Sequence, residues 1–229
     1  MKYRNEWKYL CNNIDYELID NKLSKVLNYD MHANKKHYYE VHSLYFDDYK
    51  DNCLKDNDAG LSKRYKWRIR YYDNNTSVLY LERKEKLNGM CRKKSAKLDE
   101  ETYHHLIQGE YKEVFWKEDN NLIKQFCIEG MVRLFKPKVI VDYERVAYIE
   151  PITNIRITFD KNVSASKEVD KFNKGGYTKV PILNTNNYVF EVKFDDILPS
   201  HIKKTLYLNK LQQTTFSKYY LSRLSLGGH

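Results

Sequence analysis

The feature of this chain that most constrains its fold is a strict alternation of charged and apolar residues in short segments. Within 66–70, three cations, Lys66, Arg68 and Arg70, alternate with two apolar residues. Successive side chains of a β-strand point to opposite faces, so such a segment carries one ionic and one apolar face. A solvated sheet face would mix in Ser, Thr and Asn, whereas this face is dominated by charge. The pattern predicts a closed sheet whose ionic faces line a charged lumen.

The same alternation recurs with charges of both signs. Glu82 and Lys84 share one parity, and Glu191 and Lys193 alternate with apolar residues over 190–194. Taken singly, a basic strand is typical of a solvated face, and a Glu-x-Lys strand of a cross-strand ion pair on the surface. Repetition along the chain favours the lumen instead.

For one predicted strand, two assignments of the inward face are possible. Over 140–147, either Asp142 and Glu144 or Tyr143 and Arg145 can point into the lumen. The remaining strands contribute Glu6, Lys8, Arg156 and either Lys93 or Lys94 to the ionic register.

Periodicity and turn residues give the expected element order. Strands are predicted over 4–9, 41–47, 65–72, 78–86, 92–94, 138–149, 155–160 and 188–195. Helices are predicted from 15, from a cap at Asp99, over 119–129 with Gly130 closing the helix, over 199–211 and from 214. The polar segments 51–63 and 161–187 are predicted as loops. This is an α+β fold: a single-domain antiparallel β tunnel barrel of about eight strands, with flanking helices, over residues 1–226, and 227–229 are set aside as a tag remnant.

Composition narrows the class of partner. The net charge of +9 favours anionic partners, and the 21 Tyr residues fall mostly in predicted helix stripes and strand cores. Nucleic-acid binding is not expected, because the cations share strand registers with carboxylates instead of forming one exposed basic face. Four cysteines without C-x-x-C spacing indicate reduced, buried thiols and a cytoplasmic protein. No segment is apolar enough to predict a transmembrane span.

A lumen crowded with like charges is unstable unless a ligand compensates it. A phosphate chain would do so, because Arg pairs with phosphate oxygens through two donors and Lys acts as a point charge. The carboxylates in the same registers would suit a hard divalent ion, Mg²⁺ or Mn²⁺, between the protein and phosphate oxygens.

An ordered set of short motifs resembles the VTC domain, the polyphosphate polymerase domain of the triphosphate tunnel metalloenzyme (CYTH-like) superfamily. The motifs are RNEWKYL at 4–10, SLYFD at 43–47, KWRIRYY at 66–72, LERK at 81–84, DYER at 142–145, RITFD at 156–160, FEVK at 190–193 and FSKYY at 216–220. The resemblance covers about residues 3–222. It implies a tunnel barrel that polymerises phosphate from ATP with Mn²⁺ or Mg²⁺.

The resemblance also implies roles for individual residues. The tunnel phosphate ligands that carry catalysis would be Arg68, Arg70, Lys84, Arg145 and Arg156. Further phosphate contacts are expected from Lys8, Lys93, Tyr143, Ser217 and Lys218, to which the strand registers add Lys66 and Lys193. The metal ligand would be Glu191, assisted by Glu6 or Glu82.

Three functions fit these residues. The first is an ATP-dependent polymerase that transfers the γ-phosphoryl group of ATP to a growing polyphosphate chain. The second is a hydrolase of triphosphate or short polyphosphate, in which water replaces the chain as acceptor. The third is a non-catalytic polyphosphate-binding protein. No protein partner is predicted from the sequence.

Overall fold

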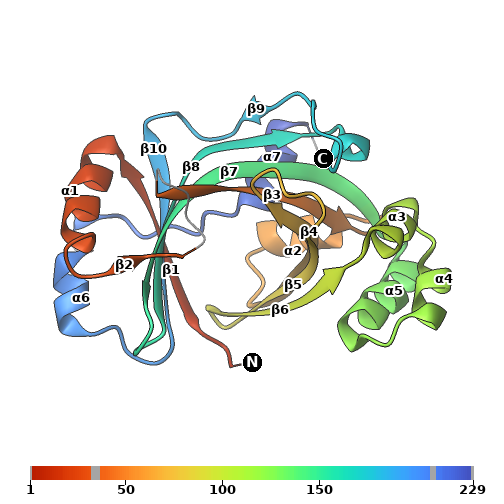
Figure 1. The fold of residues 1–229 in the computed structure, drawn as a ribbon, viewed down its shortest axis with the longest axis horizontal. Coiled ribbons are helices and arrows are strands. Elements are labelled where there is room, and N and C mark those ends of the chain that lie inside the picture. The colour runs from red at the N-terminus through yellow and green to blue at the C-terminus, as the bar shows by residue number, and fades with distance from the viewer. Residues whose placement is uncertain (1, 32–36, 207–209, 228–229) are drawn as a thin grey trace.

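A long antiparallel sheet curls around the centre of the molecule (Figure 1). The computed structural model describes residues 2–31, 37–206 and 210–227. The strands are β1 (Asn5–Asn12), β2 (Asn28–Tyr29), β3 (Tyr38–Asp47), β4 (Lys63–Tyr72), β5 (Leu79–Leu87), β6 (Met90–Leu98), β7 (Lys136–Glu150), β8 (Ile155–Ser166), β9 (Val180–Pro181) and β10 (Asn187–Phe194). The main path runs β1-β10-β8-β7-β3-β4-β5-β6, with β2 paired to β7 and β9 to β8.

The two edge strands of this path approach each other where the sheet curls round. Arg4, just before β1, and Cys91 on β6 exchange two backbone hydrogen bonds of 2.8 Å. A continuous ladder does not join the edges, so the sheet is curled and not fully closed. The predicted α+β antiparallel tunnel fold is confirmed, with ten strands in the described ranges in place of about eight.

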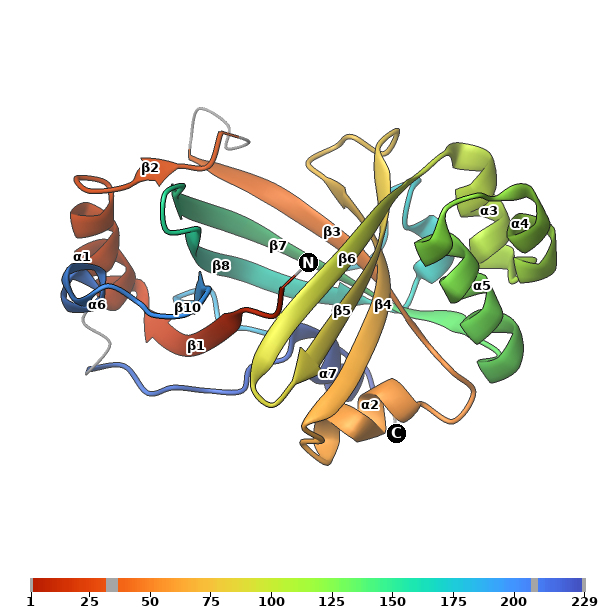
Figure 2. The same cartoon turned by 90° about the horizontal axis from the view of Figure 1, so that it is seen from below.

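The helices in the described ranges flank the sheet. They are α1 (Asn13–Leu23), α2 (Asn52–Asp58), α3 (Glu100–Gln108), α4 (Tyr111–Lys117), α5 (Asn121–Arg133), α6 (Ser200–Thr205) and α7 (Lys218–Ser225), with a short 3₁₀ turn at Val169–Lys171. Figure 2 shows α3, α4 and α5 at one end and α1 and α6 at the other. Asp99 caps α3, because its carboxylate accepts a hydrogen bond from the Thr102 backbone N–H at 2.7 Å.

The apolar strand faces point outward and are covered by these helices. Trp67 and Ile69 pack with Phe126 of α5, and Phe159 and Phe190 pack in a second cluster with Ile19 of α1. The alternate, charged positions therefore face the inside of the curl. In most soluble proteins apolar residues lie inside and polar residues outside. In this curled sheet the inner face is charged and the outer faces are apolar. A third apolar cluster, formed around Tyr45, Val141 and Tyr219, lies between the sheet, α2 and α7.

The prediction of a loop over 51–63 was wrong, because α2 forms there. The Asp47 carboxylate accepts hydrogen bonds from the backbone N–H groups of Cys53 and Leu54 at 2.9 and 3.0 Å. Asp48 likewise accepts one from Asn52 at 3.0 Å. Carboxylates at the end of β3 thus satisfy the donors that a helix start leaves unpaired.

The C-terminal part of the chain also departs from prediction. Strand β8 continues beyond residue 160 to Ser166, so the segment 161–187 is not wholly a loop. Gly130 does not end α5, which continues to Arg133 and ends at Leu134 in a left-handed conformation. Residues 207–209 of the predicted helix over 199–211, and residues 228 and 229 of the segment set aside as a tag, lie outside the described residues. Within the described ranges, no helix combines the length and hydropathy that a membrane crossing requires.

Candidate functional site

The curled sheet encloses a cavity of about 570 Å³ with a strongly charged lining. It is formed by inward-facing residues of the strands and by the start of α7. Of the predicted site residues, those on its wall are Glu6, Lys8, Lys66, Arg68, Arg70, Lys84, Lys93, Tyr143, Arg145, Arg156, Glu191, Lys193, Ser217 and Lys218. Glu82 lines a smaller neighbouring pocket, which shares Lys93 and Arg156 with the cavity.

Strand register sets these side chains in rows. In the hairpin of β4 and β5, Lys66 lies opposite Lys84 and Arg68 lies opposite Glu82. The next row along β4 begins at Arg70, two residues on. Because every second residue of a strand points to the same face, this one hairpin supplies three successive rows of charge to the cavity.

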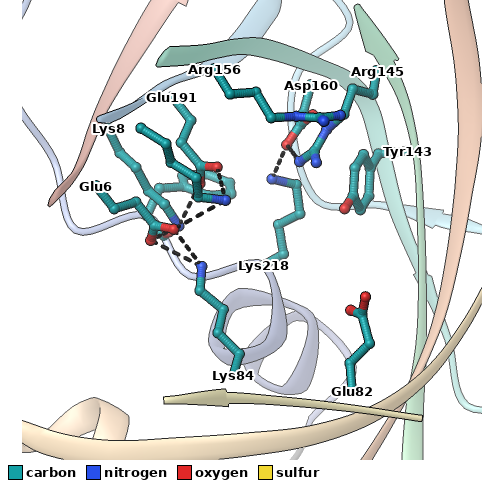
Figure 3. Close-up of polar contacts among 12 residues, drawn as sticks. Glu6, Lys8, Glu82, Lys84, Tyr143, Arg145, Arg156, Asp160, Glu191 and Lys218 are labelled. Carbon is teal, nitrogen blue, oxygen red and sulfur yellow. Dashed lines mark hydrogen bonds and ion pairs between the residues drawn. The ribbon is translucent and has the colours of Figure 1, made fainter. Parts of the chain in front are cut away.

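Glu6 of β1 and Glu191 of β10 come together in a cluster with three lysines (Figure 3). Lys84 lies 2.7 Å from Glu6, and Lys193 lies 2.7 Å from Glu191. Lys8 lies within ion-pair distance of both carboxylates, at 3.5 and 3.4 Å. The side chains of both glutamates are buried. Two carboxylates from neighbouring strands therefore face the same small volume.

Opposing effects act on the protonation of this pair. Burial raises the pKa of Glu6, but Lys84, Lys8 and Lys193 together hold it well below its ordinary value. Burial and the charge of Glu6 raise the pKa of Glu191, and the same lysines outweigh both and hold it well below the usual range. Both carboxylates are thus ionised at neutral pH, which is the form that binds a cation.

A second cluster is formed by Arg145, Asp160 and Lys218. The Arg145 guanidinium donates two hydrogen bonds to Asp160, at 2.6 and 2.8 Å, and Lys218 of α7 donates a third at 2.5 Å. Lys218 also lies over the ring of Tyr143, 4.7 Å from its centre. Strand β7 therefore presents Tyr143 and Arg145 to the cavity. Asp142 instead contacts His42 and Tyr177.

A third cluster gathers around Glu82. Its carboxylate lies 2.7 Å from Arg68, 2.6 Å from Lys93 and 3.6 Å from Arg70. Figure 3 shows Glu82 apart from Glu6 and Glu191. The three carboxylates predicted as metal ligands thus do not converge: two share one cluster, and Glu82 belongs to another.

Two tyrosines of β3 were missed as site residues. The hydroxyl of Tyr45 accepts a hydrogen bond from Arg68 at 2.9 Å, and that of Tyr39 accepts one from Arg156 at 2.7 Å. Burial raises the pKa of Tyr45, but Arg68 and Arg70 more than offset this and lower it. Strand β3 has uncharged residues at most inward positions, so the search for alternating charge passed over it. The alternation of Tyr39, Val41, Ser43 and Tyr45 was the available signal.

The donor set of Glu6 and Glu191 suits a hard divalent cation. Mg²⁺ and Mn²⁺ take oxygen ligands, and Mg²⁺ is commonly held by one or two carboxylates together with substrate phosphates. Two ionised carboxylates from adjacent strands meet that requirement. Within the described residues, the cluster in which three potential ligand groups converge is another one, His105, Glu110 and Glu113, at the helical end of the molecule. Glu110 and Glu113 are exposed to solvent.

A curled antiparallel sheet with a charged interior and outward apolar faces defines the triphosphate tunnel (CYTH-like) fold. A Hippeastrum protein, described as a putative adenylyl cyclase with a dominant triphosphatase activity, superposes with a TM-score of 0.59 at 15% identity, covering 98% of this chain and 96% of that one. A putative adenylate cyclase from Bacillus halodurans gives 0.54 at 12% identity, with 94% of each chain covered.

The family follows from the sequence. The family model of the VTC domain matches residues 3–226, and the chain belongs to that family. No curated protein sequence matches the chain.

Proposed function

We propose that this protein is a metal-dependent phosphotransferase that extends inorganic polyphosphate with the γ-phosphoryl group of ATP. The observation that carries the proposal is the charge of the cavity: cations outnumber carboxylates on its wall, and most of these cations are at least partly shielded from solvent. Cations crowded away from water repel each other and lose solvation, so the site is complete only with a polyanion in it. Membership of the VTC family agrees with a phosphate chain as that polyanion.

The arginines have the geometry that phosphate recognition needs. Arg68, Arg70 and Arg145 are each held by hydrogen bonds to neighbouring side chains, so their guanidinium planes are fixed before a ligand arrives. Fixed cations stabilise the charge that spreads over the phosphoryl oxygens as the bond to the leaving oxygen breaks. These residues act by position and charge, and no protein nucleophile is required.

In the proposed reaction, a terminal oxygen of the polyphosphate chain forms a bond to the γ-phosphorus of ATP. The bond from that phosphorus to the bridging β–γ oxygen breaks, and ADP leaves with the electron pair. Lys218 and Arg145 would hold the transferred group, and Lys84 and Lys193 the neighbouring phosphates. Glu6 and Glu191 would hold Mn²⁺ or Mg²⁺, which when bound neutralises negative charge on phosphate oxygens.

Hydrolysis is the second candidate. It is favoured by the likeness in fold to the Hippeastrum protein, which is described as having a dominant triphosphatase activity. The same arginines and lysines would bind the triphosphate, and water would take the place of the chain end as acceptor. The two reactions differ in what occupies the acceptor position, not in the residues that bind phosphate.

The deciding experiment is incubation of the purified protein with ATP and either Mn²⁺ or Mg²⁺, with ADP, free phosphate and long-chain polyphosphate resolved separately. A parallel reaction with EDTA measures the dependence on metal. ADP accompanied by lengthening chains is the expected result. Free phosphate without chains would replace the polymerase by a hydrolase. Binding of polyphosphate without turnover would leave a non-catalytic binder and refute both reactions.

A further inference from the structure

The cations on the cavity wall differ in whether a carboxylate accompanies them. Among the residues that the structure describes, all but three of these cations lie within ion-pair distance of an Asp or Glu. The three exceptions are Arg64, Lys66 and Lys86. They lie on the paired strands β4 and β5. The uncompensated charge of the cavity is thus concentrated in one place.

Strand register makes these three residues neighbours. Arg64 lies directly opposite Lys86, and Lys66 is on the same face of β4 one row further in. Like charges directly opposite in a sheet destabilise the pair. Within the described residues, no carboxylate lies within ion-pair distance of either side chain, and Asp56 and Glu6 act on them only from farther away.

The polar contacts of the three residues are neutral. The Lys66 ammonium donates hydrogen bonds to Asn57 Oδ1 and Ser217 Oγ, both at 2.7 Å. Arg64 donates to the backbone carbonyl of Leu61. The Lys86 ammonium has no hydrogen bond or ion pair within the described part of the chain, although its backbone is part of the sheet. A ligand could therefore bind all three without breaking an ion pair.

Electrostatics agrees with this geometry. Burial lowers the pKa of Lys66 well below its ordinary value, and the charges of Lys8, Lys84 and Arg64 lower it further. Burial also lowers the pKa of Lys86, and Arg64 and Lys8 reinforce the effect. Burial and neighbouring cations thus both disfavour the charged forms of Lys66 and Lys86.

The three residues lie at the opposite end of the cavity wall from Arg70. Among the residues of β4 that share the inward face, Arg64 is the first in the ladder and Arg70, opposite Tyr80, is the last. Six residues of extended strand span about 20 Å, which exceeds the length of a triphosphate. At the Arg70 end, the neighbouring pocket contains Tyr72, Tyr80 and the carboxylates Asp30 and Glu82. One end of the cavity thus places its cations beside carboxylates and aromatic rings. Among the described residues, the other end carries three cations without an ion-pair partner, next to Tyr65 and Glu85, whose carboxylate is paired with Arg83 and Arg92.

We propose that Arg64, Lys66 and Lys86 form a separate subsite for the distal phosphates of a long inorganic polyphosphate chain, which leaves the cavity at this end. This inference rests on the proposed function, because it assumes that the cavity holds a phosphate polymer. A triphosphate bound at the inner clusters does not need this subsite, whereas a long chain crosses it. The subsite therefore distinguishes long chains from short ones.

The test compares two probes, inorganic tripolyphosphate and long-chain inorganic polyphosphate, by titration calorimetry at low and moderate salt. The variant is the double substitution Arg64→Gln and Lys86→Gln. Affinity for the long chain is expected to fall by about tenfold, with a shallower dependence on salt, while affinity for tripolyphosphate changes by less than about twofold. The matched control removes two exposed cations far from the cavity, Lys112→Gln with Lys174→Gln, and is expected to bind both probes like the wild type.

The other possible results contradict either the proposed subsite or the proposed function. An unchanged affinity for the long chain, or an equal loss for both probes, would overturn the subsite. Failure of the wild-type protein to bind either probe would instead overturn the proposed function. If the double variant does not fold, the single variant Lys86→Gln, which breaks no hydrogen bond described here, must still weaken long-chain binding selectively. Without ligand, Lys86→Gln is expected to melt no lower than the wild type, because it relieves repulsion.

Discussion

At the scale of single residues, the cavity is a set of cations whose orientation is fixed by neighbours. Arg68 shows this best: its guanidinium contacts Glu82 at 2.7 Å and the Tyr45 hydroxyl at 2.9 Å. Arg145 is fixed in the same way by two hydrogen bonds to Asp160. Side chains held like this lose little further freedom when a phosphate binds, so their charge is available at low entropic cost.

Replacing Arg68 with Gln tests its role in catalysis. Turnover of ATP is expected to fall by about 100-fold, because a preorganised cation of the proposed phosphate-binding wall is lost. The fold should survive, since Glu82 keeps Lys93 at 2.6 Å. The readout is kcat beside a thermal melt.

Arg83→Gln is the matched control for that variant. Arg83 is on β5 next to Glu82, but it points to the outer face, where it pairs with Glu85 and lies 4.3 Å from the centre of the Tyr65 ring. This control should lose stability and keep its turnover. A turnover of Arg68→Gln equal to that of the wild type, on folded protein, would remove Arg68 from the proposed machinery.

The pH dependence of stability can be tested at Asp160. Burial raises the pKa of this carboxyl, but Arg145 and Lys218 outweigh it and lower the pKa from 3.8 to about 2. A folded-state pKa below the unfolded value stabilises the fold above the unfolded pKa. That contribution, about 2 kcal/mol, is lost as the pH falls through the folded pKa.

The measurement is urea unfolding of the wild type and of Asp160→Asn between about pH 7 and about pH 2. The gap in unfolding free energy should be widest near neutral pH and should narrow in acid, because a protonated Asp160 resembles Asn. A gap that is constant with pH would contradict the assigned ion pairs.

At the scale of elements, alternating charge predicted the strands well because their outward faces are apolar and their inward faces ionic. Lys66, Arg68 and Arg70 are found on the cavity wall for this reason. The separation of Glu82 from Glu6 could not be predicted, because it depends on how far the sheet curls between β1 and β5. Helix α2 was missed because its capping carboxylates, on Asp47 and Asp48, belong to the end of the preceding strand and its connection.

The helical end of the molecule offers a test of packing. A Cβ atom at Gly130 of α5 would lie 2.8 Å from the ring of Tyr111, which itself donates a hydrogen bond to the Phe135 carbonyl at 2.7 Å. Gly130→Ala is therefore expected to destabilise the fold by about 1–3 kcal/mol, despite the better helix propensity of Ala.

Chemical denaturation measures the effect of Gly130→Ala. The control on the same helix is Val132→Ala, an exposed position where the expected change is within about 0.5 kcal/mol. Because neither residue lines the cavity, ATP turnover should be unchanged in both variants. A stabilised Gly130→Ala variant would mean that α4 and α5 can separate without cost.

At the scale of the whole molecule, the proposed function predicts that stability depends on a ligand. A tripolyphosphate that binds only the folded state at millimolar concentration and low salt is expected to raise the melting temperature by about 5 °C or more. Added salt should reduce the shift by screening. Sulfate at equal ionic strength is the control, and it should give a much smaller effect. No shift with tripolyphosphate would argue strongly against a phosphate chain in the cavity.

The meeting of the two edge strands has a topological consequence. A barrel with an unbroken ladder is a ring, and a linear polymer can enter a ring only by threading one of its ends. Here the wall has a seam, joined by the paired hydrogen bonds of Arg4 and Cys91. Among the described residues, no covalent bond and no full strand ladder crosses that seam. In topological terms the wall is a strip held shut by non-covalent contacts, so that opening of the seam would admit the middle of a polymer as well as its ends.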